Sequence, residues 1–371
     1  MTQTPPPQKE TSLIIKDPTV LTPRYEPDRV LGRTDEIREI RFYLDYLHKN
    51  TLPPHLLIVG SPGSGKTLTI KHISKEYTQN ETASITYVQA TRSPFITMRM
   101  LASQFSIKVP IRGISTFDIW LMIQDQMTRE QAIIIDEINV LLSNDEGREL
   151  INDMVRDERV CVIGVTNNIT IKEFIENQNL YSAFKPRVIE FAKYDANELR
   201  EILTYWAELA FYPGALSEGV IPLIAALVAR TNGDARYAID LLARSAEVCI
   251  KREGLHVLEE HVREAEKVVF LDLKVGAIKQ LTFVQKQLLK LVVNSKTHVF
   301  TDIYNEYVDA SVGENEKPLT RRMISYHISE LKKAMLVEIG IEGRGFRNGV
   351  GSLVYPTIDK SVIEELDALE K

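Results

Sequence analysis

The stretch Gly60-Ser61-Pro62-Gly63-Ser64-Gly65-Lys66-Thr67 decides how the rest of the chain is interpreted. It matches the phosphate-loop pattern G-x-x-x-x-G-K-[ST] at every fixed position. The apolar run before it, residues 55–59, predicts a buried parallel strand, and the apolar spacing after it predicts an amphipathic helix over residues 67–77. Strand, glycine-rich turn and helix form the context in which this motif binds phosphate. The sequence therefore predicts a nucleoside triphosphate site.

The residue types of this loop suit the parts of a triphosphate. Glycines let backbone N–H groups approach the phosphates at the positive end of the helix dipole. Lys66 would reach the β- and γ-phosphates, and the Thr67 hydroxyl would bind Mg²⁺. The residues expected to hold ATP or ADP here are Ser61, Pro62, Gly63, Ser64, Gly65, Lys66, Thr67 and Leu68. A chance glycine-rich loop is the alternative, and the flanking elements argue against it.

Composition sets outer limits. The 371 residues suffice for two or three domains, and 44% hydrophobic with 26% charged residues is ordinary for globular proteins. No apolar run approaches a membrane span, and residues 1–16 predict a disordered arm without a signal core. Cys161 and Cys249 lie in apolar segments, which favours buried thiols in a reducing cytoplasm. The net charge of −6 argues against a uniformly basic nucleic-acid binder, yet it allows a local basic patch.

Between residues 17 and 194, apolar strands alternate with helical patterns. The expected strands are residues 55–59, 85–89, 132–136, 160–165 and 188–191. This alternation predicts an α/β domain with a parallel five-stranded sheet and helices on both faces. Ligands of such sheets bind at the carboxyl ends of the strands. The predicted nucleotide site therefore lies at that edge.

Acidic and amide side chains end two of these strands. Asp136 and Glu137 follow the third strand, where we expect Asp136 to hold Mg²⁺, largely through water, and Glu137 to be the general base. Asn167 ends the next strand and would orient water or the γ-phosphate, with a turn formed by the Asn pair as the alternative. The residues upstream of the loop that would wall the adenine are Val30, Leu31 and Arg33. A plain connecting loop is the alternative there.

From residue 195 to 278 the strands stop and helical patterns follow one another. Helices are expected at residues 197–211, 220–231, 235–252 and 259–269. They predict a small all-helical lid domain. Asp234 suits a helix N-cap, whereas Arg236 is a cation in the first turn, where the helix dipole disfavours it. Contact with a γ-phosphate across the domain junction would explain Arg236, and a surface arginine is the alternative.

Residues 279–371 show a third pattern. Helices are expected at residues 284–293, 301–308 and 320–335, and a hairpin around a flexible tip at residues 343–349. Three helices and a hairpin predict a winged helix. The inner face of its third helix is expected to carry Met323, Ile324, Ile328, Leu331 and Met335.

The local charge of this region is inverted. Residues 317–347 hold seven Lys/Arg and three Asp/Glu, a charge of +4 in a chain of −6. This inversion favours a double-stranded DNA surface, with the third helix in the major groove. The side chains expected to contact DNA are Arg321, Arg322, Ser325, Tyr326, Ser329, Lys332, Arg344 and Arg347. A protein-interaction module and a merely solvated helix are the alternatives.

Taken together, these motifs resemble an AAA+ ATPase, and the C-terminal pattern resembles the archaeal origin-recognition and cell-division-control initiators. Tyr25-Glu26-Pro27-Asp28 and residues 109–115 are the more specific pieces. The resemblance implies that Asn167 is the first sensor and Arg236 the second. It also implies an initiator insertion at about residues 94–116 that touches DNA, which makes Arg99 and Arg112 candidates, with surface solvation as the alternative. Ala183 replaces the arginine finger of many AAA+ proteins, so stimulation by a neighbouring subunit is in doubt.

The sequence is thus interpreted as an ATP-dependent DNA replication initiator that binds double-stranded origin DNA. ATP binding and slow hydrolysis would act as a switch for origin recognition and helicase loading. The expected partners are origin DNA, other initiator paralogues and the replicative helicase, in the cytoplasm at the nucleoid and without a membrane. A branch-migration type DNA motor and a nucleotide-gated transcription regulator are the alternatives.

Overall fold

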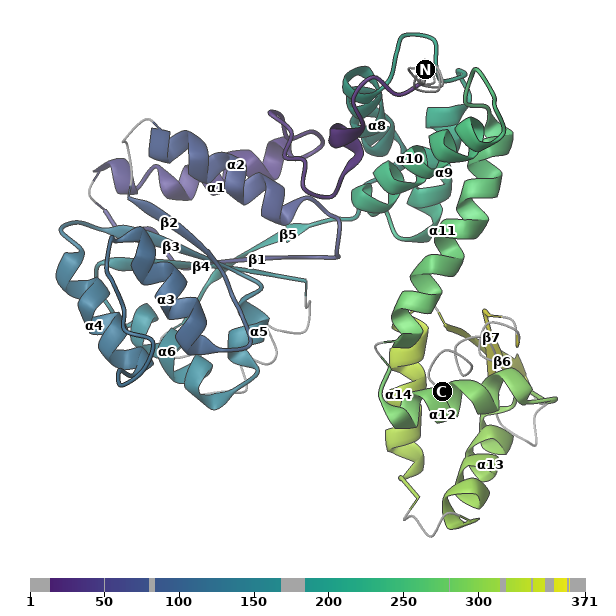
Figure 1. The fold of residues 1–371 in the computed structure, drawn as a ribbon. Coiled ribbons are helices and arrows are strands. Elements are labelled where there is room, and N and C mark those ends of the chain that lie inside the picture. Colours follow the sequence, from purple (N-terminus) through teal and green to yellow (C-terminus); the bar gives the residue numbers. More distant parts are fainter. Residues whose placement is uncertain are drawn as a thin grey trace, which may run out of the picture. The chain divides into compact units, whose positions relative to one another are not determined.

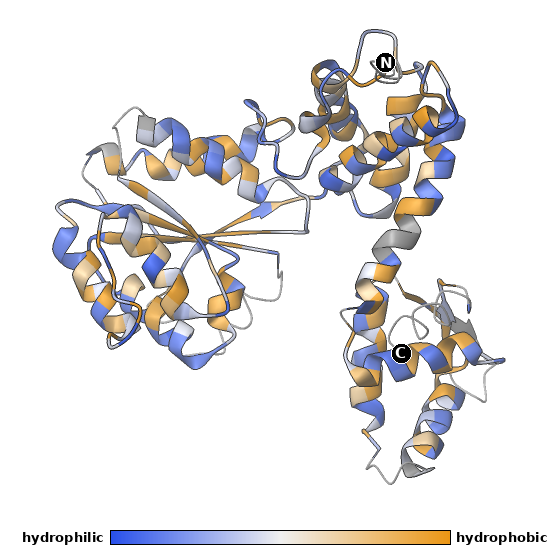
Figure 2. Cartoon of the chain, in the orientation of Figure 1, coloured by the Kyte–Doolittle hydropathy of each residue, from blue (hydrophilic) through white to orange (hydrophobic). Residues whose placement is uncertain are grey.

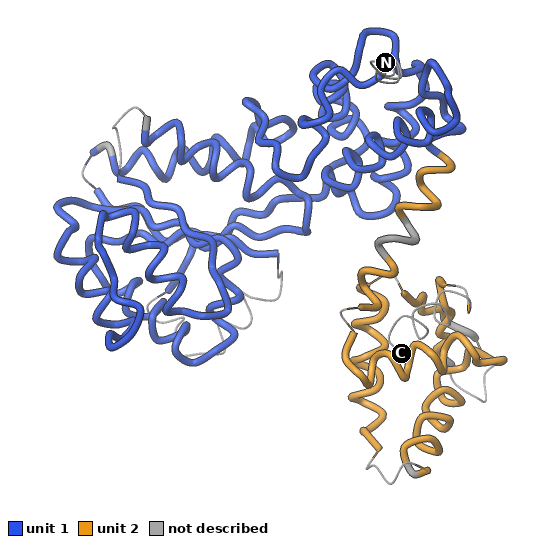
Figure 3. Tube along the Cα trace, viewed as in Figure 1, with its two compact units in different colours: residues 1–262 blue, residues 263–371 orange. Residues whose placement is uncertain are grey.

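The structure is a computed structural model. It describes residues 14–49, 51–79, 84–167, 184–279, 281–313, 318–334, 336–343, 350–358 and 360. The chain divides into two compact units, residues 1–262 and 263–371 (Figure 3). Helix α11 (Glu259–Lys279) carries the chain from the first unit into the second. Among the described residues, no helix combines the length and the apolar character that crossing a bilayer requires.

A five-stranded parallel sheet forms the centre of the first unit (Figure 1). Its strands are β1 (Leu56–Gly60), β2 (Ile85–Gln89), β3 (Gln131–Asp136), β4 (Val160–Thr166) and β5 (Arg187–Phe191). They stand in the order β2-β3-β4-β1-β5, and all neighbours run parallel. This confirms the predicted α/β fold. Because β4 lies between β3 and β1, Asp136 at the end of β3 reaches Thr67 of the phosphate loop across the end of β4.

Helices cover both faces of the sheet, whose strands are mainly hydrophobic (Figure 2). The helices before β4 are α1 (Thr34–Leu44), η2 (Leu47–Lys49), α2 (Lys66–Gln79), α3 (Pro94–Gln104), α4 (Thr116–Gln126), α5 (Ile138–Leu142) and α6 (Asp145–Val155). Ile58 and Ile134 pack with Ile70 and Ile73 of α2 on one face. The alternate strand residues pack with α3 to α6 on the other face. The phosphate loop is therefore anchored by a fully buried strand and by the buried face of α2.

The lid consists of α8 (Ala196–Ala210), α9 (Val220–Thr231), α10 (Ala235–Lys251) and the first turns of α11. Asp195 begins α8 with a capping box, because its carboxylate accepts from the Glu198 amide while the Glu198 side chain accepts from the Asp195 amide. The four predicted lid helices are present. The last of them is longer than its apolar pattern indicated, because α11 continues into the second unit.

A segment near the N-terminus packs on this lid. Ile14 is buried, Ile15 pairs with Phe211, and the backbone N–H of Lys16 donates to the Ala210 carbonyl. The short helix η1 (Pro18–Leu21) then lies against α8 and α10. The expectation of a disordered arm over residues 1–16 is therefore wrong for Ile14 to Lys16, because a buried isoleucine fastens them to the lid. Residues 1–13 lie outside the described residues.

The second unit contains α12 (Phe283–Asn294), α13 (Phe300–Gly313) and α14 (Arg321–Lys333), followed by β6 (Val337–Gly343) and β7 (Val350–Pro356). The two strands pair in antiparallel register. Ile324, Ile328 and Leu331 are buried as expected, but Met323 is 47% exposed and its expected place on the inner face is wrong. Met335 and the hairpin tip at residues 344–349 lie outside the described residues. The winged-helix assignment accordingly stays a prediction, as do the boundaries 17–194, 195–278 and 279–371.

Candidate nucleotide-binding site

The phosphate loop requires glycine at two positions where backbone and neighbours crowd together. Gly63 has φ 69° and Gly65 has φ 86°, a region that favours glycine. A Cβ on Gly63 would collide with the Asp234 carboxylate, and one on Gly65 would collide with the Tyr194 hydroxyl. The positive φ angles therefore set the shape of the loop. Asp234 of the lid and Tyr194 after β5 lie close against it.

Lys66 is buried at the start of α2. Its Nζ donates to the carbonyl oxygens of Gly60 at 2.9 Å and Ser61 at 2.8 Å. Burial lowers the pKa of the Lys66 ammonium to about 8, with the Asp136 carboxylate opposing the shift and the Arg236 charge adding to it. When a nucleotide binds, this ammonium can give up its hydrogen bonds to the loop carbonyls and donate to phosphate oxygens instead.

Asp136 is the most firmly held carboxylate of this edge. It is 4% exposed, and its Oδ2 accepts from the Thr67 hydroxyl at 2.8 Å and the Tyr87 hydroxyl at 2.9 Å. Its Oδ1 accepts from the Glu137 backbone N–H at 2.9 Å. A threonine hydroxyl in contact with a carboxylate is the oxygen pair that phosphate-loop proteins offer to Mg²⁺. The donor set therefore fits this ion.

Glu137 and Asn167 follow the ends of two neighbouring strands, β3 and β4. Glu137 is exposed and has φ 56°, a left-handed conformation that is uncommon outside glycine. Such strain is often found at functional sites. Asn167 is exposed directly after β4, and the preceding Thr166 hydroxyl donates to Asn139 Oδ1 at 2.9 Å. Both side chains thus lie at the edge where a triphosphate would end.

Arg33 takes a different place from the one expected. It is 2% exposed, its Nε donates to the Ser64 carbonyl at 2.9 Å, and its Nη2 donates to the Ala192 carbonyl at 2.7 Å. Its guanidinium lies 3.8 Å from the centroid of the Tyr194 ring. Arg33 therefore links the phosphate loop to the residue that follows β5. It does not line the cavity described next. Its assignment to the base wall has no support in this geometry.

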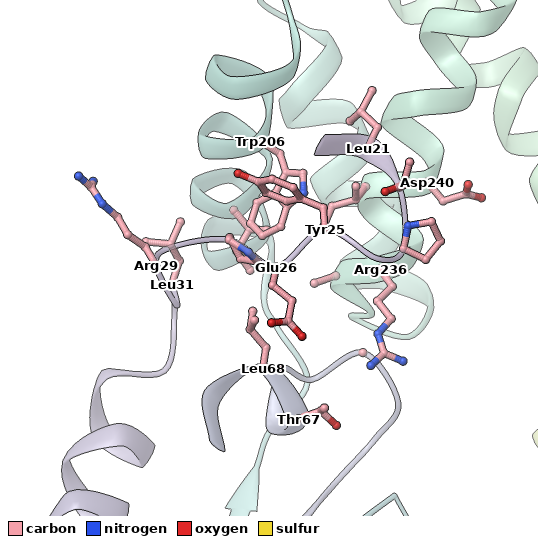
Figure 4. Close-up of a pocket in the computed structure, with 18 of the residues that line it drawn as sticks. Leu21, Tyr25, Glu26, Arg29, Leu31, Thr67, Leu68, Trp206, Arg236 and Asp240 are labelled. Atoms are coloured by element: carbon pink, nitrogen blue, oxygen red, sulfur yellow. The ribbon is translucent and has the colours of Figure 1, made fainter. Parts of the chain in front are cut away.

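A cavity of about 450 Å³ opens beside the loop, within the usual size range of ligand sites (Figure 4). Among the expected residues it is lined by Leu31, Gly63, Gly65, Thr67, Leu68 and Arg236. Val30 and Arg33 are not part of its lining, nor are Ser61, Pro62, Ser64 and Lys66. The site therefore unites residues from the N-terminal segment, the phosphate loop and the lid.

Several lining residues were missed by the sequence reasoning. They come from the segment before α1 and from α8, and they are Leu21, Thr22, Pro23, Tyr25, Glu26, Pro27, Arg29, Ile202 and Trp206. The rings of Tyr25 and Trp206 meet edge to face at 6.4 Å. Lys71 of α2 pairs with Glu26 at 2.8 Å. The signal available was Tyr25-Glu26-Pro27-Asp28, a motif whose position in the fold the sequence did not indicate.

The start of α10 touches the phosphate loop. Asp234 caps this helix by accepting from the backbone N–H groups of Arg236 at 2.8 Å and Tyr237 at 3.2 Å. The Ala235 backbone N–H donates to the Gly63 carbonyl at 3.2 Å. Arg236 points from this turn toward the loop that carries Thr67 (Figure 4). The unfavourable cation in a first turn is thus explained by its place in the cavity.

Comparison with known proteins agrees with this geometry. A family model described as an AAA domain matches residues 50–167, and one described as a Cdc6 AAA+ ATPase-type lid domain matches residues 200–267. An ORC1-type DNA replication protein of Methanothermobacter thermautotrophicus is 38% identical over 349 residues, covering 93% of this chain and 94% of the relative. The chain belongs to the ORC1-type DNA replication proteins.

Two further ORC1-type proteins support this membership. The one from Pyrococcus furiosus is 32% identical over 356 residues, which are 90% of this chain and 84% of that protein. The solved structure of the Aeropyrum pernix ORC1 protein in complex with DNA is 28% identical, with a TM-score of 0.74 and coverage of 96% and 97% of the two chains. The AAA+ ATPase fold described above is therefore that of the family.

The expected DNA side chains of this ORC1-type chain are only partly within the described residues. On α14, Arg322, Tyr326 and Lys332 are exposed. Arg321 is exposed but engaged, since its Nη2 donates to the Thr301 hydroxyl at 3.0 Å and its guanidinium lies 5.3 Å from the Phe300 ring centroid. The remaining candidates are Ser325, which is exposed, Ser329 and Arg99, which are half-buried, and Arg112, which is exposed. Arg344, Arg347 and Ala183 lie outside the described residues.

Proposed function

We propose that this protein is an ATP-dependent replication initiator that binds double-stranded origin DNA and uses ATP binding and slow hydrolysis as a switch. The observation that carries the proposal is the contact of the lid with the phosphate loop. Ala235 and Arg236 of α10 meet Gly63 in one cavity. A ligand in that cavity would therefore contact the lid. DNA binding by the same chain is supported by its likeness to an ORC1 protein solved with DNA.

Each residue at the edge of the sheet has a defined chemical task in this proposal. Lys66 would bind the β- and γ-phosphates, and Thr67 with Asp136 would hold Mg²⁺, which neutralises phosphate charge when bound. Glu137 would take the proton of the attacking water. Asn167 and Arg236 would orient the γ-phosphate from β4 and from the lid.

The DNA surface of the proposal is the exposed side of α14. It offers Arg322 and Lys332 to phosphates, which would supply affinity, while Tyr326 would contact bases or sugars. Arg99 and Arg112 would add contacts from the first unit. Other initiator subunits and the replicative helicase are the partners that this function requires, and the residues that would meet them stay unassigned.

Footprinting on the host's own genomic DNA tests the proposal directly. We expect protection at a small number of discrete sites that changes between ATP and ADP. The Lys66→Ala variant removes the phosphate-binding cation, so its footprint should no longer respond to ATP. Uniform protection along the DNA, with no response to nucleotide, would contradict the initiator function.

The alternatives predict different outcomes in the same setting. A branch-migration type motor would form rings and show fast ATP turnover stimulated by DNA. A nucleotide-gated transcription regulator would protect promoters and leave replication starts unprotected. Ala183 stands where many AAA+ proteins carry a trans-acting arginine, and Arg187 is the one candidate substitute nearby, which argues against a cooperative motor.

A further inference from the structure

Tyr87 contacts the catalytic edge without belonging to any of its motifs. Its hydroxyl donates to Asp136 Oδ2 at 2.9 Å, the same oxygen that accepts from the Thr67 hydroxyl at 2.8 Å. Tyr87 is not part of the cavity lining. Its printed contact with the catalytic edge is the one to Asp136.

The sheet register explains how this side chain reaches Asp136. Tyr87 of β2 pairs with Ile134 of β3, and Gln89 pairs with Asp136. Side chains alternate along a strand, so residues 134 and 136 share one face with Tyr87. A tyrosine two positions before the end of β2 can thus lean along the strand and place its hydroxyl beside the last carboxylate of β3. A phenylalanine at the same position would fill the same space without donating a hydrogen bond.

The ring of Tyr87 is itself held in place. The Lys71 ammonium of α2 lies 5.5 Å from the ring centroid and also pairs with Glu26 at 2.8 Å. The side-chain amide of Gln104 on α3 donates to the backbone carbonyl of Tyr87, which fixes the strand at this residue. The donor is thus fixed in position.

Asp136 needs a donor that does not itself bind the metal, because Thr67 has a second role toward Mg²⁺. If Thr67 binds Mg²⁺ through its oxygen, its only link to Asp136 is its proton. The Glu137 N–H holds the other carboxylate oxygen from within the same turn. Tyr87 is then the one described side chain outside the two nucleotide motifs that donates to the carboxylate. Partners of this kind orient metal-binding carboxylates and commonly contribute 10- to 100-fold to metal affinity or activity.

We propose that Tyr87 is a positioning residue that orients the Asp136 carboxylate for Mg²⁺–ATP. The proposal rests on the proposed function, in that it takes Asp136 as the residue that holds Mg²⁺. It goes beyond that function by assigning a role to β2, an edge strand of the sheet that carries none of the nucleotide motifs.

The Tyr87→Phe variant tests this role in the full-length protein. The readout is binding of a fluorescent ATP analogue as a function of Mg²⁺ concentration, together with binding in EDTA. We expect the Mg²⁺ concentration for half-maximal binding to rise roughly tenfold. Affinity in EDTA should be unchanged, because the phosphate loop is intact. In turnover experiments the same variant should approach the wild-type rate at high Mg²⁺.

The matched control is Tyr77→Phe. Tyr77 is a buried tyrosine whose hydroxyl likewise donates to an aspartate, Asp45, at 2.5 Å, but it lies at the other end of α2. Its Mg²⁺ dependence should equal that of the wild type. Equal Mg²⁺ dependence of Tyr87→Phe and wild type would overturn the proposal, as would a loss of binding that is the same with and without Mg²⁺.

The wild type separates failure of this inference from failure of the proposed function. If wild-type protein binds the ATP analogue in an Mg²⁺-dependent manner and Tyr87→Phe behaves identically, only the role of Tyr87 falls. If the wild type binds no nucleotide under any condition, the proposed function falls as well.

Discussion

Lys66 is the side chain through which pH acts on the nucleotide site. Its pKa of about 8 in the ATP-free protein reflects burial. Bound phosphates raise that pKa, because they favour the charged form. ATP binding above about pH 8 must therefore take up a proton, and affinity should fall with rising pH by up to about tenfold per pH unit.

Calorimetry between about pH 7 and about pH 9.5 checks this expectation. Proton uptake should appear as a dependence of the binding heat on the ionisation heat of the buffer. The Lys66→Arg variant is the control, since an arginine stays charged over this range and its affinity should vary less. ATP affinity that stays constant across the range would refute the role of the Lys66 proton.

Glu137 is the residue whose exchange should separate binding from hydrolysis. In Glu137→Gln the side chain keeps its size and its left-handed backbone but can no longer accept a proton. Turnover should fall by about 10² to 10⁴ while ATP affinity stays near that of the wild type. Single-turnover hydrolysis and equilibrium binding measure the two quantities. A variant that hydrolyses ATP at the normal rate would remove Glu137 from the base role.

The contact between α1 and the phosphate loop is an interaction between elements, and it depends on Arg33. In Arg33→Met two backbone carbonyls and the half-buried Glu36 lose their donor. We expect the free energy of unfolding to fall by about 3 kcal/mol, as for other buried ionic groups that lose a partner. Denaturant unfolding of the variant and the wild type measures the difference.

The same helix offers a control. Arg38 pairs with Asp35 on the surface of α1, where the two side chains are 74% and 88% exposed. Arg38→Met should change the free energy of unfolding by less than about 1 kcal/mol, because exposed pairs contribute little. Equal effects of the two substitutions would mean that Arg33 does not anchor the loop.

The whole molecule is expected to bind DNA through an exposed, basic helix in a chain of net charge −6. The double variant Arg322→Ala, Lys332→Ala removes two exposed cations of α14 while leaving Arg321 on Phe300 and Thr301. Two lost phosphate contacts should flatten the plot of log affinity against log salt by about 1.8. Duplex binding at several salt concentrations gives this slope.

Arg244→Ala is the control for the DNA measurement. Arg244 lies on the lid helix α10 and contacts Glu247 at 3.2 Å. Arg244→Ala removes one positive charge, as does each of the two α14 substitutions. It should nevertheless leave the salt slope unchanged. If the α14 variant keeps the wild-type slope, the DNA surface lies elsewhere on the chain.

Much of the site was predictable because its signals are local. The phosphate loop, Asp136 and Glu137 each follow an apolar strand within a few residues. Asp234 is a typical helix N-cap, and Arg236 is a cation in the first turn, where the helix dipole disfavours it. These patterns depend on backbone geometry and burial of neighbouring residues, which a linear sequence records. Met323 shows the limit of such reasoning, since an apolar residue at the border of a helical face was assigned inward and is exposed.

By itself, the sequence determined the α/β sheet, the nucleotide loop and the acidic strand end, because each of these arises from hydrophobic periodicity and from residues adjacent in the chain. Tertiary structure alone decided which distant residues serve that loop. Arg33 donates to the Ser64 carbonyl, and the rings of Tyr25 and Trp206 pack together in the cavity. The Tyr87 hydroxyl donates to Asp136, 49 positions away in the sequence. Those placements follow from strand order and lid docking, which bring together side chains whose spacing in the sequence carries no period.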